Sequence, residues 1–251
     1  MKVCIVIPYY NHGEAIAQVL LSLRPFDLEC LIVDDGSDAA AKTKLLDAVA
    51  GRRDVSVVTR PTNGGKGAAV MTGCDAALAL GFTHALQIDA DGQHNAADIP
   101  RLLAAAREQP DALISGQAVY DESAPQSRHY GRYVTHVWVW INTLSLEIKD
   151  SMCGLRVYPL AAACSVWRRA SIGKRMDFDV EIMVRMAWAG IPIVNIPTRV
   201  TYPSDGVSHF RMLRDNVLIS GMHARLFGGM LLRSPLLLAR RFIRRTPKVA
   251  A

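Results

Sequence analysis

The chain has 251 residues, of which 50% are hydrophobic and 21% are charged, and its formal net charge is +6. This balance is typical of a folded globular protein and excludes an intrinsically disordered one. The five cysteines are odd in number, widely spaced and without a C-x-x-C pair, so we expect neither a disulfide framework nor a structural zinc site, and a reducing compartment fits best.

Apolar runs of strand length alternate with helical patterns through the first half of the chain. The runs are largely apolar rather than alternating, which is typical of strands covered on both faces of a parallel sheet. We expect strands at residues 3–8, 28–33, 55–59, 85–88 and 112–115, with helices between them at residues 14–23, 39–50, 67–80 and 97–108. This order predicts an α/β domain with an open sheet that binds its ligands beyond the carboxyl ends of the strands.

The second half of the chain is less regular. The pattern predicts a helix over residues 130–148, a turn over 150–156, a helix over 178–189, a proline-interrupted extended segment over 191–200 and a loop over 202–210. The chain shows no internal repeat and no low-complexity linker. We therefore expect one domain over residues 1–210 and a helical extension over residues 211–251.

Polar clusters follow four of the predicted strands. They are Tyr9-Tyr10-Asn11, Asp34-Asp35-Gly36-Ser37, Asn63-Gly64-Gly65-Lys66-Gly67 and Asp89-Ala90-Asp91-Gly92-Gln93-His94. Because the carboxyl ends of parallel strands meet at one edge of a sheet, we expect these clusters to line one crevice.

Each cluster has a functional interpretation and a plain structural one. Asp89 and Asp91 could share a hard cation such as Mg²⁺ or Mn²⁺, although two nearby acids are also common in solvated loops. Asp34 and Asp35 could contact a nucleobase or ribose, or only form a strand-to-helix turn. The glycine-rich loop around Lys66 suits a diphosphate, but it is neither a Walker A loop nor a dinucleotide fingerprint.

Further candidates lie in the second half. Asp179 and Glu181 stand at the start of a predicted helix, where acids are favoured by the helix dipole whether or not they are catalytic. His209, in a predicted loop, could contact a metal or a phosphate, although most single loop histidines do neither.

Positive charge is concentrated at the C-terminal end of the chain. Residues 207–251 contain nine Lys and Arg residues and one acid, Asp215. Leu, Met and Phe alternate with Arg over residues 222–245, which favours a helix lying on an anionic membrane surface; over 222–233 a core-packing helix is equally consistent. The apolar interleaving argues against nucleic-acid binding. The first apolar run is too short for a signal peptide, and Arg233 and Pro235 interrupt the best candidate for a membrane span.

Taken together and in this order, the motifs resemble those of the family 2 glycosyltransferases with the GT-A fold, in particular the polyprenyl-phosphate hexosyltransferase branch. The resemblance covers residues 3–210. It is carried by Ile7-Pro8-Tyr9-Tyr10-Asn11, Val33-Asp34-Asp35-Gly36-Ser37, the glycine-rich loop at 63–67, Asp89-Ala90-Asp91-Gly92-Gln93-His94, Ser151-Met152-Cys153-Gly154-Leu155-Arg156 and Phe178-Asp179-Val180-Glu181.

The resemblance implies an inverting transfer of a sugar from a nucleotide-diphosphate donor, with UDP and GDP both open. It implies a Rossmann-like, mostly parallel sheet with helices on both faces and a divalent metal, Mg²⁺ or Mn²⁺. Its implied roles follow the motifs: nucleotide-sugar contacts from Pro8, Tyr10, Asn11, Asp34, Asp35, Lys66, Asp89 and Gln93; metal ligation by Asp89 and Asp91; an acceptor side at Gly154, Arg156 and His209; and a base from Asp179 or Glu181.

The acceptor and the location are separate expectations. The basic tail favours a lipid or lipid-linked acceptor and peripheral contact, through residues 222–245, with the inner face of the cytoplasmic membrane. A sugar-1-phosphate nucleotidylyltransferase is one alternative, although Tyr9-Tyr10-Asn11 replaces the loop that such an enzyme expects after its first strand. A non-enzymatic membrane adaptor on a degenerate transferase fold is the other.

Overall fold

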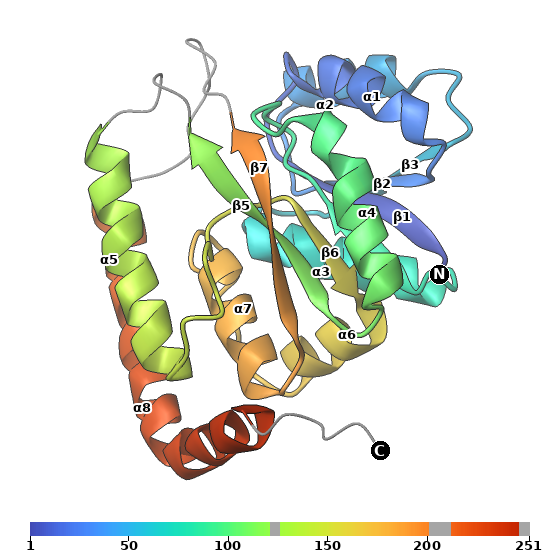
Figure 1. Cartoon of the computed structure of the whole chain (residues 1–251). Helices are drawn as coiled ribbons and strands as arrows, with labels where there is room; N and C mark the ends of the chain where they lie inside the picture. The colour runs from blue at the N-terminus through green and yellow to red at the C-terminus, as the bar shows by residue number, and fades with distance from the viewer. Residues whose placement is uncertain (121–125, 201–211, 246–251) are drawn as a thin grey trace.

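A mixed sheet between two layers of helices forms the body of the protein, seen here in a computed structural model that describes residues 1–120, 126–200 and 212–245 (Figure 1). Within these residues seven strands make one sheet in the order β3-β2-β1-β4-β6-β5-β7. The strands are β1 (Val3–Tyr9), β2 (Cys30–Asp34), β3 (Val55–Thr59), β4 (His84–Gln87), β5 (Leu113–Tyr120), β6 (Arg156–Pro159) and β7 (Ile193–Val200).

All strands except β6 run in one direction. β1 pairs in parallel with β2 and β4, β2 with β3, and β5 with β7, whereas β6 is antiparallel to both β4 and β5. The carboxyl ends of the six parallel strands therefore share one edge of the sheet. The predicted parallel arrangement is confirmed for β1, β2, β3 and β4, and the fifth predicted strand, at 112–115, is β5, which runs in the same direction.

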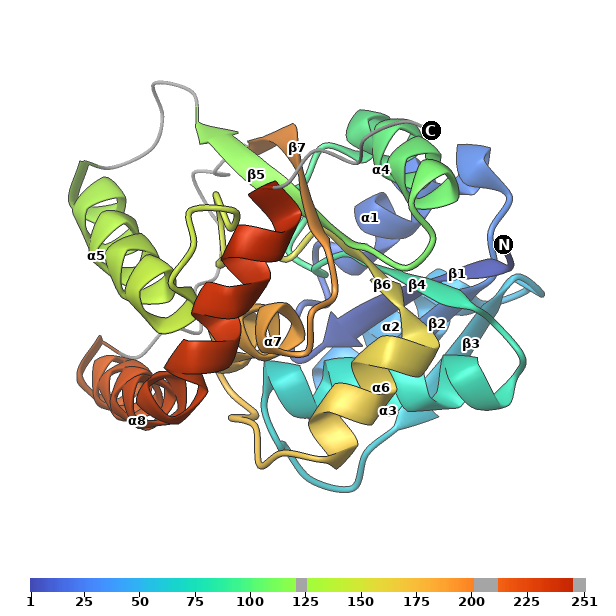
Figure 2. The same cartoon turned by 60° about the horizontal axis from the view of Figure 1, so that its bottom comes forward.

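Helices cover both faces of the sheet (Figures 1 and 2). They are α1 (Ile16–Leu23), α2 (Ala39–Val49), α3 (Lys66–Ala79), α4 (Ile99–Glu108), α5 (Gln126–Thr143), α6 (Leu160–Arg168), α7 (Phe178–Trp188) and α8 (Met212–Arg245), with short 3-10 turns η1 (Arg24–Phe26) and η2 (Ala96–Asp98). In β1, Ile5 and Ile7 join the core with α1, α2 and α4, and Val6 joins the core with α3, α6 and α7. Burial on both faces explains why the apolar runs do not alternate.

Two elements of the second half were not predicted from the sequence. The expected turn at 150–156 leads directly into β6, a four-residue strand that begins at the charged Arg156, and α6 follows without a loop. So short a strand lies below the length at which a periodic signal stands out. The extended segment at 191–200 is confirmed as β7, an edge strand that tolerates Pro197 because an edge position needs fewer backbone donors.

The last helix, α8, packs against the domain over much of its length. Met222, Leu226 and Met230 join the core shared by α3, α6 and α7. The helix contains Pro235, and its C-terminal part bends beneath α7 (Figures 1 and 2). The Ser234 hydroxyl donates to the Leu231 carbonyl, which loses its helical donor at the proline. No helix among the described residues is long and apolar enough to cross a membrane.

Candidate active site

The Lys66 ammonium lies between two carboxylates at the carboxyl edge of the sheet. Its Nζ is 2.8 Å from Oδ2 of Asp89, which follows β4, and 2.7 Å from Oδ2 of Asp179, in the first turn of α7. Burial alone would lower the pKa of Lys66, but Asp179 and Asp89 outweigh it and hold that pKa well above its usual range. Lys66 therefore stays protonated between the two carboxylates.

The glycines around Lys66 let the loop pack tightly against the segment before α7. Gly65 has a φ of 98°, and a Cβ there would lie 2.4 Å from the Lys174 carbonyl oxygen. A Cβ at Gly67 would lie 2.4 Å from the Phe178 side chain. This close approach is how residues more than a hundred positions apart bring Lys66 to Asp179.

Asp35 holds the same loop from the other side. Its Oδ1 accepts hydrogen bonds from Arg60 Nε at 2.7 Å and from the Gly64 amide at 3.0 Å, and its Oδ2 accepts from the Gly65 amide at 2.7 Å. Asp34 accepts from the Ser37 amide and lies 3.9 Å from the Lys42 ammonium. In this structure both buried aspartates organise loops at the predicted nucleotide end of the crevice.

The loop after β1 joins the loop after β2 through Asn11. Its amide donates to Ser37 Oγ, and its side-chain oxygen accepts from the Asp38 amide. Asn11 has a φ of 55°, a left-handed conformation that asparagine tolerates better than most residues. Pro8 is buried in β1 and Tyr10 is half-buried next to this loop. Two of the predicted clusters are therefore brought together.

Asp89 is enclosed by several groups besides Lys66. His94 Nε2 lies 3.5 Å from its Oδ2, and Gly154 faces it so closely that a Cβ there would lie 2.2 Å from Oδ2. Burial alone would raise the pKa of Asp89, but Lys66 and His94 outweigh it and hold that pKa far below its usual range. In the sequence, His94 stands out only as the last residue of the motif at 89–94, and no pattern there predicts its contact with Asp89.

The residues after β4 fit a divalent cation that also binds phosphate. Asp91 is half-buried and accepts from the Gln93 amide at 3.0 Å, so the chain turns back at this point. The described residues contain no cluster of three His, Cys, Asp or Glu side chains able to hold a metal. Mg²⁺ and Mn²⁺ are commonly bound by one or two carboxylates together with phosphate oxygens, which suits Asp89 and Asp91 with a diphosphate.

Arg156 lies beneath this site, where the sequence predicted an acceptor-side residue. Its side chain is fully buried, and it donates to the carbonyl oxygens of Cys153, Ser151 and Asp179. Its Nη1 is also 3.6 Å from Asp179 Oδ1. An acceptor cannot reach a guanidinium in that position, so the structure gives Arg156 a positioning role under Asp179 and the Gly154 turn.

Glu181, the other predicted base, points away from Lys66. It is fully buried, accepts from the Gly173 amide, and pairs with Arg185 at 2.6 Å and with Arg225 of α8 at 3.3 Å. Residues two positions apart on a helix lie on nearly opposite faces, so Asp179 and Glu181 cannot both face one site. The structure thus brings Asp179 alone into the cluster. His209 lies outside the described residues.

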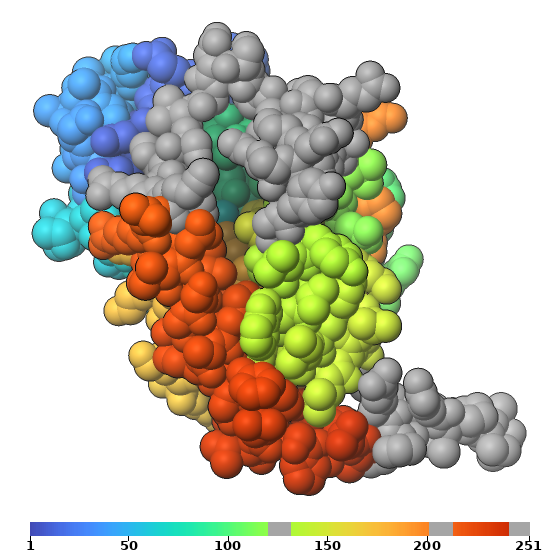
Figure 3. Space-filling view, turned by 90° about the vertical axis from the view of Figure 1, so that its left-hand side faces the viewer, coloured from blue at the N-terminus to red at the C-terminus, as the bar shows by residue number. Residues whose placement is uncertain are grey.

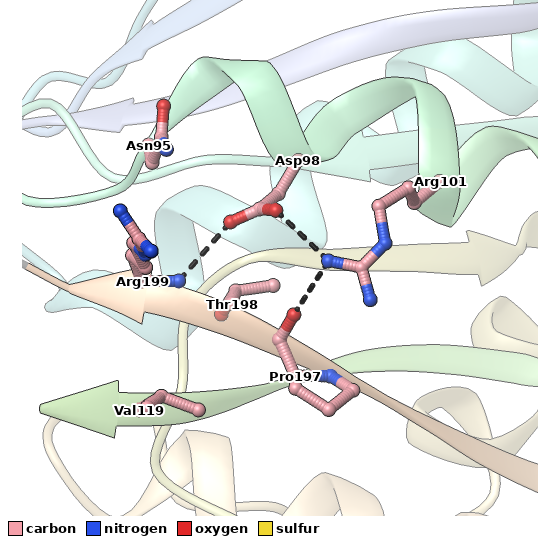
Figure 4. Close-up of a pocket in the computed structure, with 7 residues that line it drawn as sticks. All are labelled: Asn95, Asp98, Arg101, Val119, Pro197, Thr198 and Arg199. Carbon is pink, nitrogen blue, oxygen red and sulfur yellow. Dashed lines mark hydrogen bonds and ion pairs between the residues drawn. The ribbon is translucent and has the colours of Figure 1, made fainter.

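A pocket of about 370 Å³ opens at the β7 edge, apart from the Lys66 cluster (Figure 4). Its lining includes the ends of β5 and β7 and the start of α4. Asp98 there accepts from Arg101 Nη1 at 3.1 Å and from the Arg199 amide at 3.1 Å. Arg101 balances the charge of Asp98 inside this pocket, and none of the predicted site residues that the structure describes lines it.

The sheet gathers an aspartate pair, a glycine-rich loop and Lys66 beyond its carboxyl edge, which is where open α/β sheets bind their ligands. A model of the family described as "Glycosyl transferase family 2" matches residues 4–175. The chain belongs to that family and is a family 2 glycosyltransferase.

The similar proteins carry related names. An undecaprenyl-phosphate mannosyltransferase of Micrococcus luteus is 30% identical over 202 residues, covering 78% of this chain and 82% of the relative. A polyprenol monophosphomannose synthase of Mycolicibacterium smegmatis is 27% identical over 223 residues, covering 82% of this chain and 80% of the relative.

Solved structures agree on the fold. Glucosyl-3-phosphoglycerate synthase of Mycobacterium tuberculosis, in complex with Mn²⁺, UDP and phosphoglyceric acid, superposes with a TM-score of 0.66 at 15% identity. The match covers 92% of this chain and 77% of that one. It establishes the GT-A fold that the motifs implied.

Proposed function

We propose that this protein transfers a sugar, with inversion, from a nucleotide-diphosphate donor to a lipid phosphate at the inner face of the cytoplasmic membrane, with a divalent metal. The observation that carries the proposal is the Lys66 ammonium held between Asp89 and Asp179 beside a loop of backbone amides. The names of the relatives from Micrococcus luteus and Mycolicibacterium smegmatis support the acceptor class.

On the donor side, Pro8, Tyr10 and Asn11 would line the nucleoside pocket together with Asp34 and Asp35. Asp89 and Asp91, with Gln93 close by, would hold Mg²⁺ or Mn²⁺, which neutralises negative charge on a diphosphate.

Lys66 supplies the chain's own positive charge where the leaving diphosphate develops negative charge. To contact that group, Lys66 would exchange one of its carboxylate partners for a phosphate oxygen. Lys66 is 20% exposed in this structure, which leaves an approach for the diphosphate.

On the acceptor side, an oxygen of the lipid phosphate attacks the anomeric carbon from the face opposite the diphosphate. The new carbon–oxygen bond forms as the bond to the diphosphate breaks, so the configuration inverts. A phosphate is already ionised near neutral pH and needs no base.

Asp179 then serves to position Lys66 and to face the sugar. Its Oδ1 is buried, has no hydrogen-bond partner within the described part of the chain and lies 3.6 Å from Arg156 Nη1, whereas its Oδ2 contacts Lys66. A hydroxyl acceptor would instead require Asp179 to remove a proton.

The first test is thermal stabilisation by UDP and by GDP, each with and without Mn²⁺, on the wild type and on Asp91→Ala. A ligand that binds only the folded state adds about 2.7 kcal/mol of stability at a hundredfold excess over its Kd. We expect a metal-dependent shift with one nucleotide that is lost in Asp91→Ala.

Transfer from the matching labelled nucleotide sugar to a short-chain polyprenyl phosphate in detergent then tests the acceptor. If neither nucleotide stabilises folded protein, the proposal fails and a membrane adaptor on a transferase fold becomes the better account. Release of pyrophosphate from a nucleoside triphosphate and a sugar 1-phosphate would instead identify a nucleotidylyltransferase.

A further inference from the structure

One face of the molecule presents α5 and α8 side by side (Figure 3). The exposed residues of the two helices form an apolar stripe along this face. Six exposed, uncharged positions of α8 repeat at three- and four-residue spacing, so they lie on one side of the helix. They are Leu213, Val217, Ser220, Ala224, Phe227 and Leu231. No charged residue interrupts these six positions, whereas the opposite side of the helix carries the buried core residues described above.

The stripe continues onto α5 through an aromatic contact. The rings of Trp138 and Phe227 meet edge to face with centroids 6.2 Å apart, and the two residues are 38% and 39% exposed. Val134 and Ile141 lie four residues before and three residues after Trp138 and are also exposed. We call these exposed positions of α5 and α8 together the α5–α8 face.

We propose that the α5–α8 face is the surface that lies on an anionic lipid bilayer. This inference rests on the proposed function and names the surface through which the protein contacts the membrane. Two helices form that surface: it includes α5, and on α8 it begins before residue 222. The segment beyond Pro235 turns away, since Arg240 Nη1 donates to the Trp188 carbonyl oxygen at 2.6 Å.

Charge selects a bilayer over a second copy of the chain. The stripe is flanked by exposed Arg214 and by Arg225, which is 54% exposed beside its partner Glu181, and the one acid of α8, Asp215, is buried. Two copies joined through this face would bring two basic surfaces together, whereas anionic headgroups would attract them. Trp and Phe side chains are also well suited to the headgroup region.

Both helices of this face connect directly to the candidate active site. Arg132 of α5 pairs with Asp150, which opens the loop leading to Gly154 against Asp89. Arg225 of α8 pairs with Glu181 of α7, the helix that carries Asp179. A bilayer on this face would therefore place lipid-embedded acceptors close to the edge of the sheet where the Lys66 cluster lies.

The test is co-sedimentation of the full chain with vesicles of phosphatidylglycerol and phosphatidylcholine, and with phosphatidylcholine alone. The test variant is Val217→Ser with Leu231→Ser, at residues 70% and 55% exposed. The matched control is Leu21→Ser with Leu46→Ser, at residues 59% and 61% exposed on α1 and α2, across the sheet. We expect the wild type and the control to bind anionic vesicles, and the test variant to bind roughly tenfold more weakly.

A second readout places the surface directly. Tryptophan fluorescence should be quenched by brominated lipids in the wild type and much less in Trp138→Phe. Trp167 and Trp188 are buried, and half-buried Trp140 lies two residues along α5 from Trp138, on nearly the opposite side of the helix, with its indole N–H donating to the Ile148 carbonyl oxygen. Equal binding by the test variant and the control would overturn the proposal, as would equal binding to neutral and anionic vesicles. A wild-type dimer that Val217→Ser with Leu231→Ser converts to monomer would show that a second copy covers this face.

Failure here is distinguishable from failure of the proposed function. Stabilisation by nucleotide and transfer to a short-chain acceptor in detergent do not depend on the α5–α8 face, and we expect both to be unchanged in the test variant. Transfer to an acceptor embedded in vesicles should fall together with vesicle binding.

Discussion

Lys66 Nζ lies 2.7 Å from Oδ2 of Asp179, a residue more than a hundred positions away in the sequence. The contact joins the glycine-rich loop after β3 to the first turn of α7. The contact holds the glycine-rich loop against α7 and sets the position of the Lys66 ammonium.

Removing the Lys66 ammonium should impair transfer and leave the fold intact. We expect Lys66→Met to lower the transfer rate by about 10²–10³-fold, the range seen when one charge-stabilising donor is lost from an active site. The assay is transfer to a short-chain polyprenyl phosphate, with circular dichroism to confirm folding. Lys44→Met is the matched control, because Lys44 lies on α2 and pairs with the exposed Glu14. A rate within tenfold of the wild type in Lys66→Met would contradict this role.

Substitution of Asp179 should mainly lower activity, whereas substitution of Glu181 should mainly lower stability. Asp179→Asn should slow transfer roughly ten- to hundredfold, since a hydrogen bond to a charged group is worth about 1.5–3 kcal/mol. Glu181→Gln weakens a buried contact with Arg185 and Arg225, so we expect a loss of about 2–3 kcal/mol in unfolding free energy and near-normal transfer below the Tm. Urea unfolding and initial rates check the pair. Full activity in both variants would refute any catalytic contribution from either acid, whereas a loss of transfer in folded Glu181→Gln would show that Glu181 contributes to transfer.

The close approach of Gly154 to Asp89 predicts a steric effect. In Gly154→Ala the added Cβ would lie 2.2 Å from Asp89 Oδ2, so the carboxylate or the turn must move. We expect weaker metal-dependent stabilisation by nucleotide and slower transfer. Gly228→Ala is the control, because a Cβ at that helical position would meet nothing within 4 Å. Unchanged metal dependence in Gly154→Ala would show that the turn moves without disturbing Asp89.

His223 should make the α5–α8 contact sensitive to acid. Burial lowers its pKa from 6.5 to about 4, and Asn142 Nδ2 lies 3.3 Å from its Nδ1. Because the unfolded chain binds this proton more readily than the folded one, the stability contributed by neutral His223 is complete above about pH 6.5 and declines toward pH 4.

The measurement is unfolding free energy against pH for the wild type and for His223→Gln. The variant should show a shallower decline between pH 6.5 and 4. Parallel curves for the two proteins would assign the acid sensitivity to other groups.

The sequence alone determined the first half of the fold. Apolar runs such as residues 3–8 and 28–33 identify the strands found at Val3–Tyr9 and Cys30–Asp34, and the polar clusters after these runs mark the carboxyl edge. These signals are local, because a strand's burial and its terminal turn are written in consecutive residues. They were sufficient to place Lys66 and Asp89 at one edge.

Only the tertiary structure decided which residues from the second half of the chain reach the candidate active site. Asp179 and Glu181 are equivalent as sequence, but one turns toward Lys66 and the other toward Arg225, because the packing of α7 fixes which side of the helix faces the site. The resemblance implied that Arg156 belongs to the acceptor side, but the folded loop supplies carbonyl oxygens that hold its guanidinium out of reach. The α5–α8 face likewise depends on two helices far apart in sequence, so the apolar stripe of either helix alone did not reveal it. Contacts between distant segments depend on how the elements pack, and no local pattern of residues encodes them.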